Sequence, residues 1–189
     1  NKTEQKGMGD YPNGKNIHYS IREHAMAAIN NGIARYGLFL PFSATFFIFS
    51  DYLKPSARIA ALMGIKHFFV FTHDSIGVGE DGPTHQPIEQ LSTFRAMPNF
   101  YTFRPADGNE NAASWQAALN LNAPSAFVLS RQGLDPLAKG EFGEVSNGAY
   151  LLSSAKDAKI TFIASGSEVS LCVKAAALLA EKGIGDGSY

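Results

Sequence analysis

Cysteine is nearly absent from this sequence. The chain has one cysteine, Cys172, among 189 residues, so no disulfide can form within it and a cysteine-rich metal site is excluded. Cys172 lies in a helix-like run, where a small core residue is the ordinary role and a reactive thiol is the alternative. The sequence also lacks the run of ~18 apolar residues that a membrane span needs, and it lacks a signal-peptide pattern. We therefore expect a reduced, soluble, cytoplasmic protein that makes no contact with a membrane.

An excess of charge of either sign is missing as well. The chain has sixteen Lys and Arg residues and seventeen Asp and Glu residues, which gives a formal net charge of -1. Without a basic face, nucleic acid is not an expected partner. Charged residues make up 17% of the chain and hydrophobic residues 45%, which is enough apolar mass for a core. The length suits one ordinary domain, or one domain with a piece of another.

Short apolar runs alternate with stretches of helical periodicity along most of the chain. The predicted strands are 38–42, 67–72, 100–103, 126–130 and 160–164, and the predicted helices are 20–36, 45–63, 88–97, 109–121 and 168–182. Pro55 is expected to kink or divide the second helix. This alternation predicts an α/β fold with a mostly parallel sheet and helices on both faces. Ligands of such sheets gather at the loops after the carboxyl ends of the strands.

A loop-rich stretch separates the last strand–helix unit from the rest. We predict one domain over residues 1–135, a linker over 136–157, and the start of a second α/β domain over 158–189. That last piece has one strand and one helix, joined by a turn and cap at 165–167, and is too small to fold alone. The tail contains GDG at 185–187, but it follows a helix, so we interpret residues 185–189 as a truncated or foreign end and not as a metal site.

The loop over residues 72–87 carries the densest set of reactive side chains. Its sequence, THDSIGVGEDGPTHQP, places two histidines and three acidic residues on a backbone rich in glycine and proline, directly after an apolar run. Glycines allow a backbone to approach a ligand closely, and histidine moves protons near neutral pH. The pattern favours a functional loop, and the alternative is a solvated loop that caps neighbouring helices.

Other polar and aromatic residues have ordinary explanations on spacing alone. Ser20 and Glu23 fit a capping box at a helix start, and spacing favours that role for Glu23. Phe46, Phe49 and Tyr52 fall on one face of the predicted helix 45–63, where core packing is the default. Arg131, taken alone, is typical of a surface salt bridge.

The loop 72–87 resembles the signature of the transketolases almost letter for letter. The segments IHYSIREHAM at 17–26, PFSATF at 41–46 and SRQ at 130–132 are similar to that family as well, and the resemblance covers about residues 1 to 182. Related thiamine-diphosphate enzymes, such as deoxyxylulose-phosphate synthase, carry a looser form of the loop. The resemblance implies a pyrimidine-binding domain of a thiamine-diphosphate enzyme. Its implied reaction transfers a two-carbon ketol unit from a ketose phosphate to an aldose phosphate, in the pentose phosphate pathway.

The resemblance also implies roles for the cofactor-side residues. Glu23 matches the glutamate that hydrogen-bonds N1′ of the cofactor's aminopyrimidine, which makes it a catalytic and a cofactor-binding residue. The aromatic residues Phe46, Phe49 and Tyr52 match the side chains that hold the pyrimidine ring, with Phe46 stacked on it. Phe47 is expected to remain a core residue.

Four further residues match the sugar side of the family's site. His85 is implied to be catalytic, since it matches a histidine that hydrogen-bonds substrate oxygens and helps to move protons. Asp81 matches an aspartate that reads the hydroxyl next to the reacting carbon. His73 and Arg131 match residues that grip the sugar phosphate, a task for which the planar arginine fork is well suited.

A complete transketolase has an upstream domain that binds the diphosphate and Mg²⁺, and these residues do not include it. The resemblance therefore implies half of an active site, completed by the diphosphate-binding domain of a second subunit in a homodimer, and a fragment that is inactive alone. One alternative is a non-catalytic partner or regulatory chain that keeps the fold. Another is the similar enzyme dihydroxyacetone synthase. The side chains of Glu23, His73, Asp81 and His85 favour the catalytic interpretation, because a purely structural descendant would be free to lose them.

Overall fold

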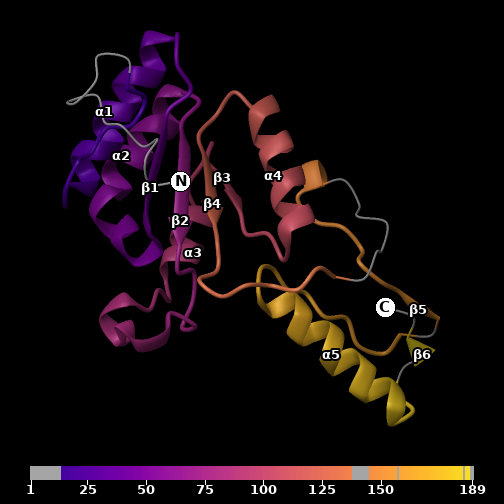
Figure 1. Ribbon diagram of the computed structural model, residues 1–189. Helices are drawn as coiled ribbons and strands as arrows, with labels where there is room; N and C mark the ends of the chain where they lie inside the picture. Colours follow the sequence, from indigo (N-terminus) through magenta and orange to yellow (C-terminus); the bar gives the residue numbers. More distant parts are fainter. Residues whose placement is uncertain (1–13, 138–144, 157, 185, 188–189) are drawn as a thin grey trace.

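A parallel four-stranded sheet forms the centre of the molecule (Figure 1). The computed structural model describes residues 14–137, 145–156, 158–184 and 186–187. The sheet has the order β1-β2-β4-β3, and all of its neighbouring strands are parallel. Its strands are β1 (Phe42–Phe46), β2 (Phe68–Thr72), β3 (Tyr101–Phe103) and β4 (Ser125–Val128).

Helices cover both faces of this sheet. They are α1 (Glu23–Tyr36), α2 (Ser50–Met63), α3 (Gln90–Arg95) and α4 (Gly108–Asn120), with α5 (Glu168–Glu181) further along the chain. Figure 1 shows α1 and α2 on one face of the sheet and α4 on the other. The predicted α/β fold with a mostly parallel sheet and helices on both faces is therefore confirmed. In the part of the chain that is described, no helix is both long and apolar enough to cross a membrane.

The alternation of side chains along the central strands explains why both faces are covered. Phe69 and Phe71 of β2 pack into the large cluster that α1, α2 and α3 contribute to. Phe68, which precedes them in the strand, packs with Phe127 and with Trp115 of α4 on the opposite face. Successive strand residues point to opposite faces, so a strand that is apolar at every position must be buried on both sides.

The first strand lies later in the chain than predicted. The predicted strand 38–42 is wrong, because β1 covers Phe42–Phe46 and pairs with β2 from Phe42 opposite Phe68 to Phe46 opposite Thr72. The residues before it, Leu38, Phe39 and Leu40, are 73%, 62% and 58% exposed. The helix α1 ends at Tyr36, as predicted, and Gly37 caps it at a φ of 89° that glycine adopts without strain. The apolar run that follows α1 is therefore a connecting segment and not a strand. Pairing with β2 decides where β1 begins.

The predicted helix 45–63 is shorter, and its proline does not divide it. Phe46 ends β1, a short 3-10 helix η1 (Phe47–Phe49) follows, and α2 begins at Ser50. Pro55 lies inside α2, which continues without interruption to Met63. Its ring leaves the carbonyl of Asp51 without a helical donor. Both residues are exposed, so water can satisfy that carbonyl.

The predicted strand 160–164 is also wrong. Among the described residues the segment 158–165 contains no strand, and Ile163 is 94% exposed. The strands of this part are β5 (Ala155–Lys156) and β6 (Asp186–Gly187), which pair antiparallel with each other. An apolar run forms a strand only where another strand pairs with it. The helix α5 begins at Glu168 as predicted, but the hydroxyl of Ser167 makes no capping bond to its backbone.

A chain of buried hydrogen bonds ties α1 to the sheet and to α2. The Tyr19 hydroxyl donates to Asn30 Oδ1 over 2.7 Å, and Asn30 Nδ2 donates to Ser43 Oγ over 2.8 Å. Ser43 Oγ lies 2.8 Å from His67 Nε2, and His67 Nδ1 lies 2.7 Å from Asn31 Oδ1. An amide oxygen only accepts, so Nδ1 carries the proton and Nε2 accepts from the serine. His67 is therefore held as the neutral imidazole.

The same chain continues from the sheet to the start of α1. Asn31 Nδ2 donates to the carbonyl of Ser56 over 2.8 Å. The Ser56 hydroxyl reaches back to His24, where Oγ lies 3.1 Å from Nδ1 and 3.3 Å from the carbonyl oxygen. The two ends of the chain lie on either side of Glu23, with Tyr19 before α1 and His24 in its first turn. We refer to these bonds from Tyr19 to His24 as the polar chain.

Acid should destabilise the fold through His67. Burial lowers the pKa of His67 from 6.5 to about 3. Between these values the unfolded chain binds a proton that the folded chain does not, so stability is complete above pH 6.5 and declines as the pH falls. Linkage gives a loss of about 1.4 kcal/mol per pH unit, or about 2 kcal/mol between pH 6.5 and 5.

Urea denaturation at both pH values, on wild type and His67→Gln, measures this contribution. The difference in the free energy of unfolding between the two proteins should shrink by about 2 kcal/mol at pH 5, because the variant has no imidazole to protonate. A difference that stays constant between the two pH values would show that His67 is not held neutral.

Candidate functional site

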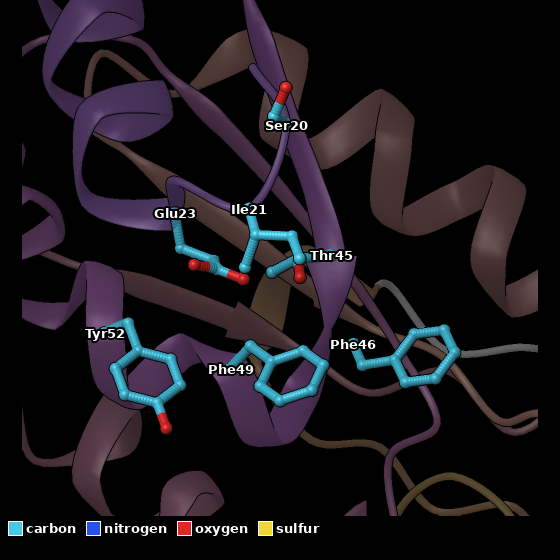
Figure 2. A pocket seen from close by; sticks show the side chains of 7 residues that line it. All are labelled: Ser20, Ile21, Glu23, Thr45, Phe46, Phe49 and Tyr52. Atoms are coloured by element: carbon cyan, nitrogen blue, oxygen red, sulfur yellow. The ribbon is translucent and has the colours of Figure 1, made fainter. Parts of the chain in front are cut away.

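A pocket opens where α1 begins and β1 ends (Figure 2). The residues that line it are Ser20, Ile21, Glu23, Thr45, Phe46, Phe49 and Tyr52. In Figure 2 the three aromatic rings lie in a row along one side of the pocket, and Glu23 lies on the other side with Ile21. Four of the eight side chains selected from the sequence therefore line one pocket: Glu23, Phe46, Phe49 and Tyr52.

The capping-box interpretation of Glu23 is wrong. The helix α1 begins at Glu23 itself, its N-cap residue is Arg22, and no side chain caps its first turn. Ser20 has a positive φ of 55° and lies outside the helix. The backbone N–H of Arg22 instead donates to the Ser20 carbonyl over 3.0 Å, which turns the chain into the helix. The half-buried Glu23 carboxylate is thus available to the pocket.

The aromatic side of the pocket is built from three consecutive elements. Phe46 ends β1, Phe49 ends η1, and Tyr52 lies in the first turn of α2, so they do not share the single helix that was predicted. Their rings nevertheless form a series, with centroids 6.1 Å apart from Phe46 to Phe49 and 6.1 Å apart from Phe49 to Tyr52. The pocket can therefore receive a flat ring against these faces.

Phe47 has the opposite orientation from its neighbour Phe46. Its side chain is fully buried and packs on Phe71 of β2 and Phe94 of α3, with centroids 5.4 Å and 6.1 Å away. The expected core role of Phe47 is confirmed. The change from extended strand to 3-10 helix between these two residues turns one ring into the pocket and the next into the core.

Two histidines of the loop 72–87 reach the same aromatic residues. His73 stacks on Phe46 with a centroid separation of 3.6 Å. His85 lies edge-on to Phe49 at 5.3 Å and to Phe46 at 6.3 Å. Both side chains are half-buried. The structure thus brings the carboxylate of Glu23, the aromatic rings and two imidazoles around one pair of phenylalanines.

The loop that carries these histidines is anchored at its beginning, middle and end. Asp74 forms a salt bridge with Arg104, which follows β3. Val78 is fully buried in the middle of the loop. Beyond the loop, Gln90 Nε2 donates to Asp51 Oδ2 over 2.9 Å, next to Tyr52. A loop held at three points can place its histidines reproducibly.

Arg131 meets the loop from the neighbouring strand. It follows β4, which pairs with β2 in the sheet, so both loops leave the same edge. Its guanidinium carbon lies 3.4 Å from the position that a Cβ would take at Gly79, whose φ is +79°. Asp81 ends the same short helix η2 (Gly79–Asp81) and is exposed. Arg131 lies against the short helix η2 that contains Asp81, and both residues lie outside the set that lines the pocket.

Sequence reasoning missed some residues of this region. Ile21 falls within the predicted helix 20–36, but it precedes α1, is 91% exposed and lines the pocket, as Thr45 does. Arg104 was not selected at all. A lone arginine after a strand carries no sequence signal, and the buried partner that distinguishes it, Asp74, lies 30 residues earlier.

The chemistry of the pocket suits a flat heteroaromatic ring with nitrogen atoms at its edge. Phenylalanine faces offer stacking surface, and a carboxylate across from them accepts a hydrogen bond from a ring N–H. The imidazoles of His73 and His85 lie beside the rings, and imidazole is a side chain suited to proton transfer. The arrangement fits a ring-binding site with proton-transfer groups at one side.

Comparisons with known proteins agree over nearly the whole chain. The family described as "Transketolase, pyrimidine binding domain" matches residues 1–136, and "Transketolase-like TK C-terminal domain" matches residues 148–186. A transketolase of Bacillus subtilis is 50% identical over 194 residues, which cover 97% of this chain and 29% of that protein. The chain thus spans about 29% of the length of the curated relatives it matches.

Solved structures give the same relationship. A transketolase of Campylobacter jejuni is 73% identical with a TM-score of 0.91, over 97% of this chain and 29% of that one. A transketolase of Pichia stipitis, solved in complex with sedoheptulose-7-phosphate, is 46% identical with a TM-score of 0.85, over 89% of this chain and 26% of that one.

Proposed function

The chain belongs to the transketolase family, and from this premise we propose that it forms the pyrimidine-binding side of a thiamine-diphosphate active site. One observation carries the proposal: the Glu23 carboxylate faces Phe46 and Phe49, the same two rings that His73 and His85 contact. Carboxylate, stacking faces and proton-transfer groups fit an aminopyrimidine ring. The proposed reaction moves a two-carbon ketol unit from a ketose phosphate to an aldose phosphate.

The residues of the pocket would hold the ring of the cofactor. When bound, thiamine diphosphate supplies the nucleophilic carbon that carries the two-carbon unit. Glu23 would share a proton with a ring nitrogen of the bound cofactor, and the negative charge of its carboxylate would favour the protonated ring. Phe46, Phe49 and Tyr52 orient the ring by stacking and exclude water from its faces. The half-buried position of Glu23 would strengthen the interaction with the ring, since the local dielectric is lower than in water.

The loop residues would act on the sugar. We assign to His85 the movement of a proton at the substrate oxygens, because it lies at the edge of the two phenylalanines that would hold the ring. We assign to Asp81 the hydroxyl next to the reacting carbon, and to His73 and Arg131 the sugar phosphate. Arg131 lies against Gly79, so its guanidinium is next to the loop 72–87. This position supports the assignment of Arg131 to the sugar phosphate.

The rest of the site is proposed to come from elsewhere. We place the pyrimidine-binding domain at 1–135, a linker at 136–157 and part of a C-terminal domain at 158–189. The two family matches, which cover 1–136 and 148–186, support this division. Mg²⁺ and the diphosphate would be held by the diphosphate-binding domain of a second subunit in a homodimer, in the cytoplasm.

The purified 189-residue chain should therefore show no ketol transfer by itself and should bind thiamine diphosphate only weakly. The physical reason is that the diphosphate contributes most of the charge of the cofactor, and its binding groups lie outside the proposed domain. A coupled assay with a ketose phosphate donor and an aldose phosphate acceptor measures the turnover.

The complete subunit, assayed under the same conditions, is the positive control. Turnover by the 189-residue chain alone would contradict the half-site proposal. Absence of turnover in the complete subunit would instead favour a non-catalytic partner chain, and turnover of formaldehyde in preference to aldose phosphates would favour a dihydroxyacetone synthase.

A further inference from the structure

We propose that Arg104 is a positioning residue that couples the first turn of α5 to the loop carrying His73. This inference rests on the proposed function only where it concerns sugar binding, because the coupling itself is a property of the fold. Arg104 follows β3 and lies between two parts of the chain that are distant in sequence. Its side chain contacts Asp74 on one side and the segment 165–168 on the other.

The contact with Asp74 is a buried, two-point ion pair. Nη2 and Nε of Arg104 lie 2.7 Å and 2.9 Å from Oδ2 of Asp74, and the two side chains are 7% and 1% exposed. The second oxygen, Oδ1, is buried and has no hydrogen-bond partner among the described residues. The position of the Asp74 carboxylate therefore depends on Arg104, since a buried carboxylate is costly without a cationic partner.

The contacts with α5 use the remaining nitrogen of the same guanidinium. Nη1 donates to the Ser165 carbonyl over 2.7 Å and also contacts the carboxylate of Glu168, the first residue of α5. Burial acts to lower the pKa of Arg104, but its bonds to Glu168 and Asp74 outweigh that effect and raise it, so the group remains charged. One cation thus joins a carboxylate of the loop to a carboxylate of α5.

The backbone at Gly166 fits closely around the same side chain. The Gly166 N–H donates to the Arg104 carbonyl over 2.9 Å. Its φ is +61°, and a Cβ at this residue would lie 2.9 Å from three atoms of the Arg104 side chain. A residue other than glycine would push the guanidinium away from its partners. The turn before α5 therefore packs closely around Arg104, and a substitution at Gly166 would disturb these contacts.

His73, one residue before Asp74, is the functional residue that this ion pair holds. It adopts a positive φ of 60°, a conformation that a non-glycine residue keeps only where its surroundings fix it. The ion pair fixes the residue after it, and the stack on Phe46 fixes its ring at 3.6 Å. A shift of the first turn of α5 would move Arg104, then Asp74, and then His73.

Arg95 provides a matched control in the same neighbourhood. Its Nη2 donates to Ser165 Oγ over 2.9 Å, so it also holds the turn before α5. It is exposed and forms no ion pair with Asp74. A change at Arg95 therefore disturbs the same turn without removing the anchor of the loop.

Hydrogen–deuterium exchange of the complete subunit tests the coupling without any assay of activity. In Arg104→Lys we expect faster exchange in the amides of both 72–78 and 165–170, because lysine keeps the charge but cannot make the two-point contact. In Arg95→Lys we expect faster exchange at 165–170 alone. Unchanged exchange at 72–78 in Arg104→Lys, or equal acceleration there in both variants, would overturn the proposal.

Asp74→Asn provides a second variant, in case Arg104→Lys does not fold. Asparagine keeps the size of the side chain and one acceptor for Arg104 but removes the charge. It should accelerate exchange at 72–78 and to a lesser degree at 165–170. The same exchange pattern as wild type would contradict the coupling.

Steady-state kinetics then separate positioning from a general loss of structure. In Arg104→Lys the KM for a phosphorylated donor should rise about fivefold or more, the lower end of common coupling energies between sites, with kcat and cofactor affinity nearly unchanged. A loss of kcat with unchanged KM would contradict a role through His73. If wild type itself shows no ketol transfer, the proposed function fails and the exchange measurement still decides the coupling.

Discussion

Replacing Glu23 with glutamine in the complete subunit is expected to reduce ketol transfer by about a hundredfold or more, the scale of a lost proton-transfer group. Glutamine keeps the shape and much of the hydrogen bonding of glutamate but has no negative charge. Without that charge the protonated state of the ring that faces it is no longer favoured. The structure removes the competing explanation, because Glu23 is the first residue of α1 and no side chain caps that turn.

The measurement is the rate of proton exchange at C2 of bound thiamine diphosphate, wild type against Glu23→Gln, at saturating cofactor. Thermal unfolding of both proteins should differ little, since the carboxylate faces a pocket and not the core. Glu181→Gln, at the far end of α5, is the matched control and should leave the exchange rate unchanged. An unchanged exchange rate in Glu23→Gln would remove Glu23 from the proposed mechanism.

Replacing Phe47 with alanine should lower the free energy of unfolding by about 3–5 kcal/mol, because a fully buried phenylalanine leaves a cavity behind. The same substitution at the preceding residue should act differently. Phe46 lines the pocket and stacks on His73, so Phe46→Ala should cost little stability. Its main effect should be a loss of cofactor affinity of about tenfold, the upper end of what one aromatic pair contributes.

Urea denaturation and titration with thiamine diphosphate, applied to both variants of the complete subunit, distinguish the two positions. Each variant is the control for the other, since they are neighbours in sequence and differ in the direction of the ring. Equal losses of stability in both would contradict the division between pocket and core at this point. Unchanged cofactor affinity in Phe46→Ala would contradict the stacking role.

The order and type of the central elements were predictable because each has a strong local pattern. The run FFVF at 68–71 is apolar at every position, and its burial between two layers follows from that alone. The errors occurred in segments where pairing with a neighbouring strand decides whether a strand forms. The apolar segments 38–41 and 160–164 have the composition of strands, but neither has a partner strand among the described residues.

The site was predictable to the extent that its residues carry a motif. The loop 72–87 was selected by composition and resemblance, and the structure places two of its histidines against Phe46 and Phe49. The helix start at Glu23 was not predictable from spacing, because Ser20 and Glu23 have the separation of a capping box without its geometry. The partners of Arg104 lie 30 and 64 residues away, which no local pattern records.

The polar chain from Tyr19 to His24 has a consequence for the binding of any ligand at Glu23. Its two ends, Tyr19 and His24, hold the chain on either side of Glu23, through bonds that cross the core at Asn30, His67 and Asn31. The conformational entropy of this segment is therefore lost when the chain folds. A ligand that arrives later finds the backbone that carries Glu23 already ordered, so less of its binding energy is consumed in arranging the site.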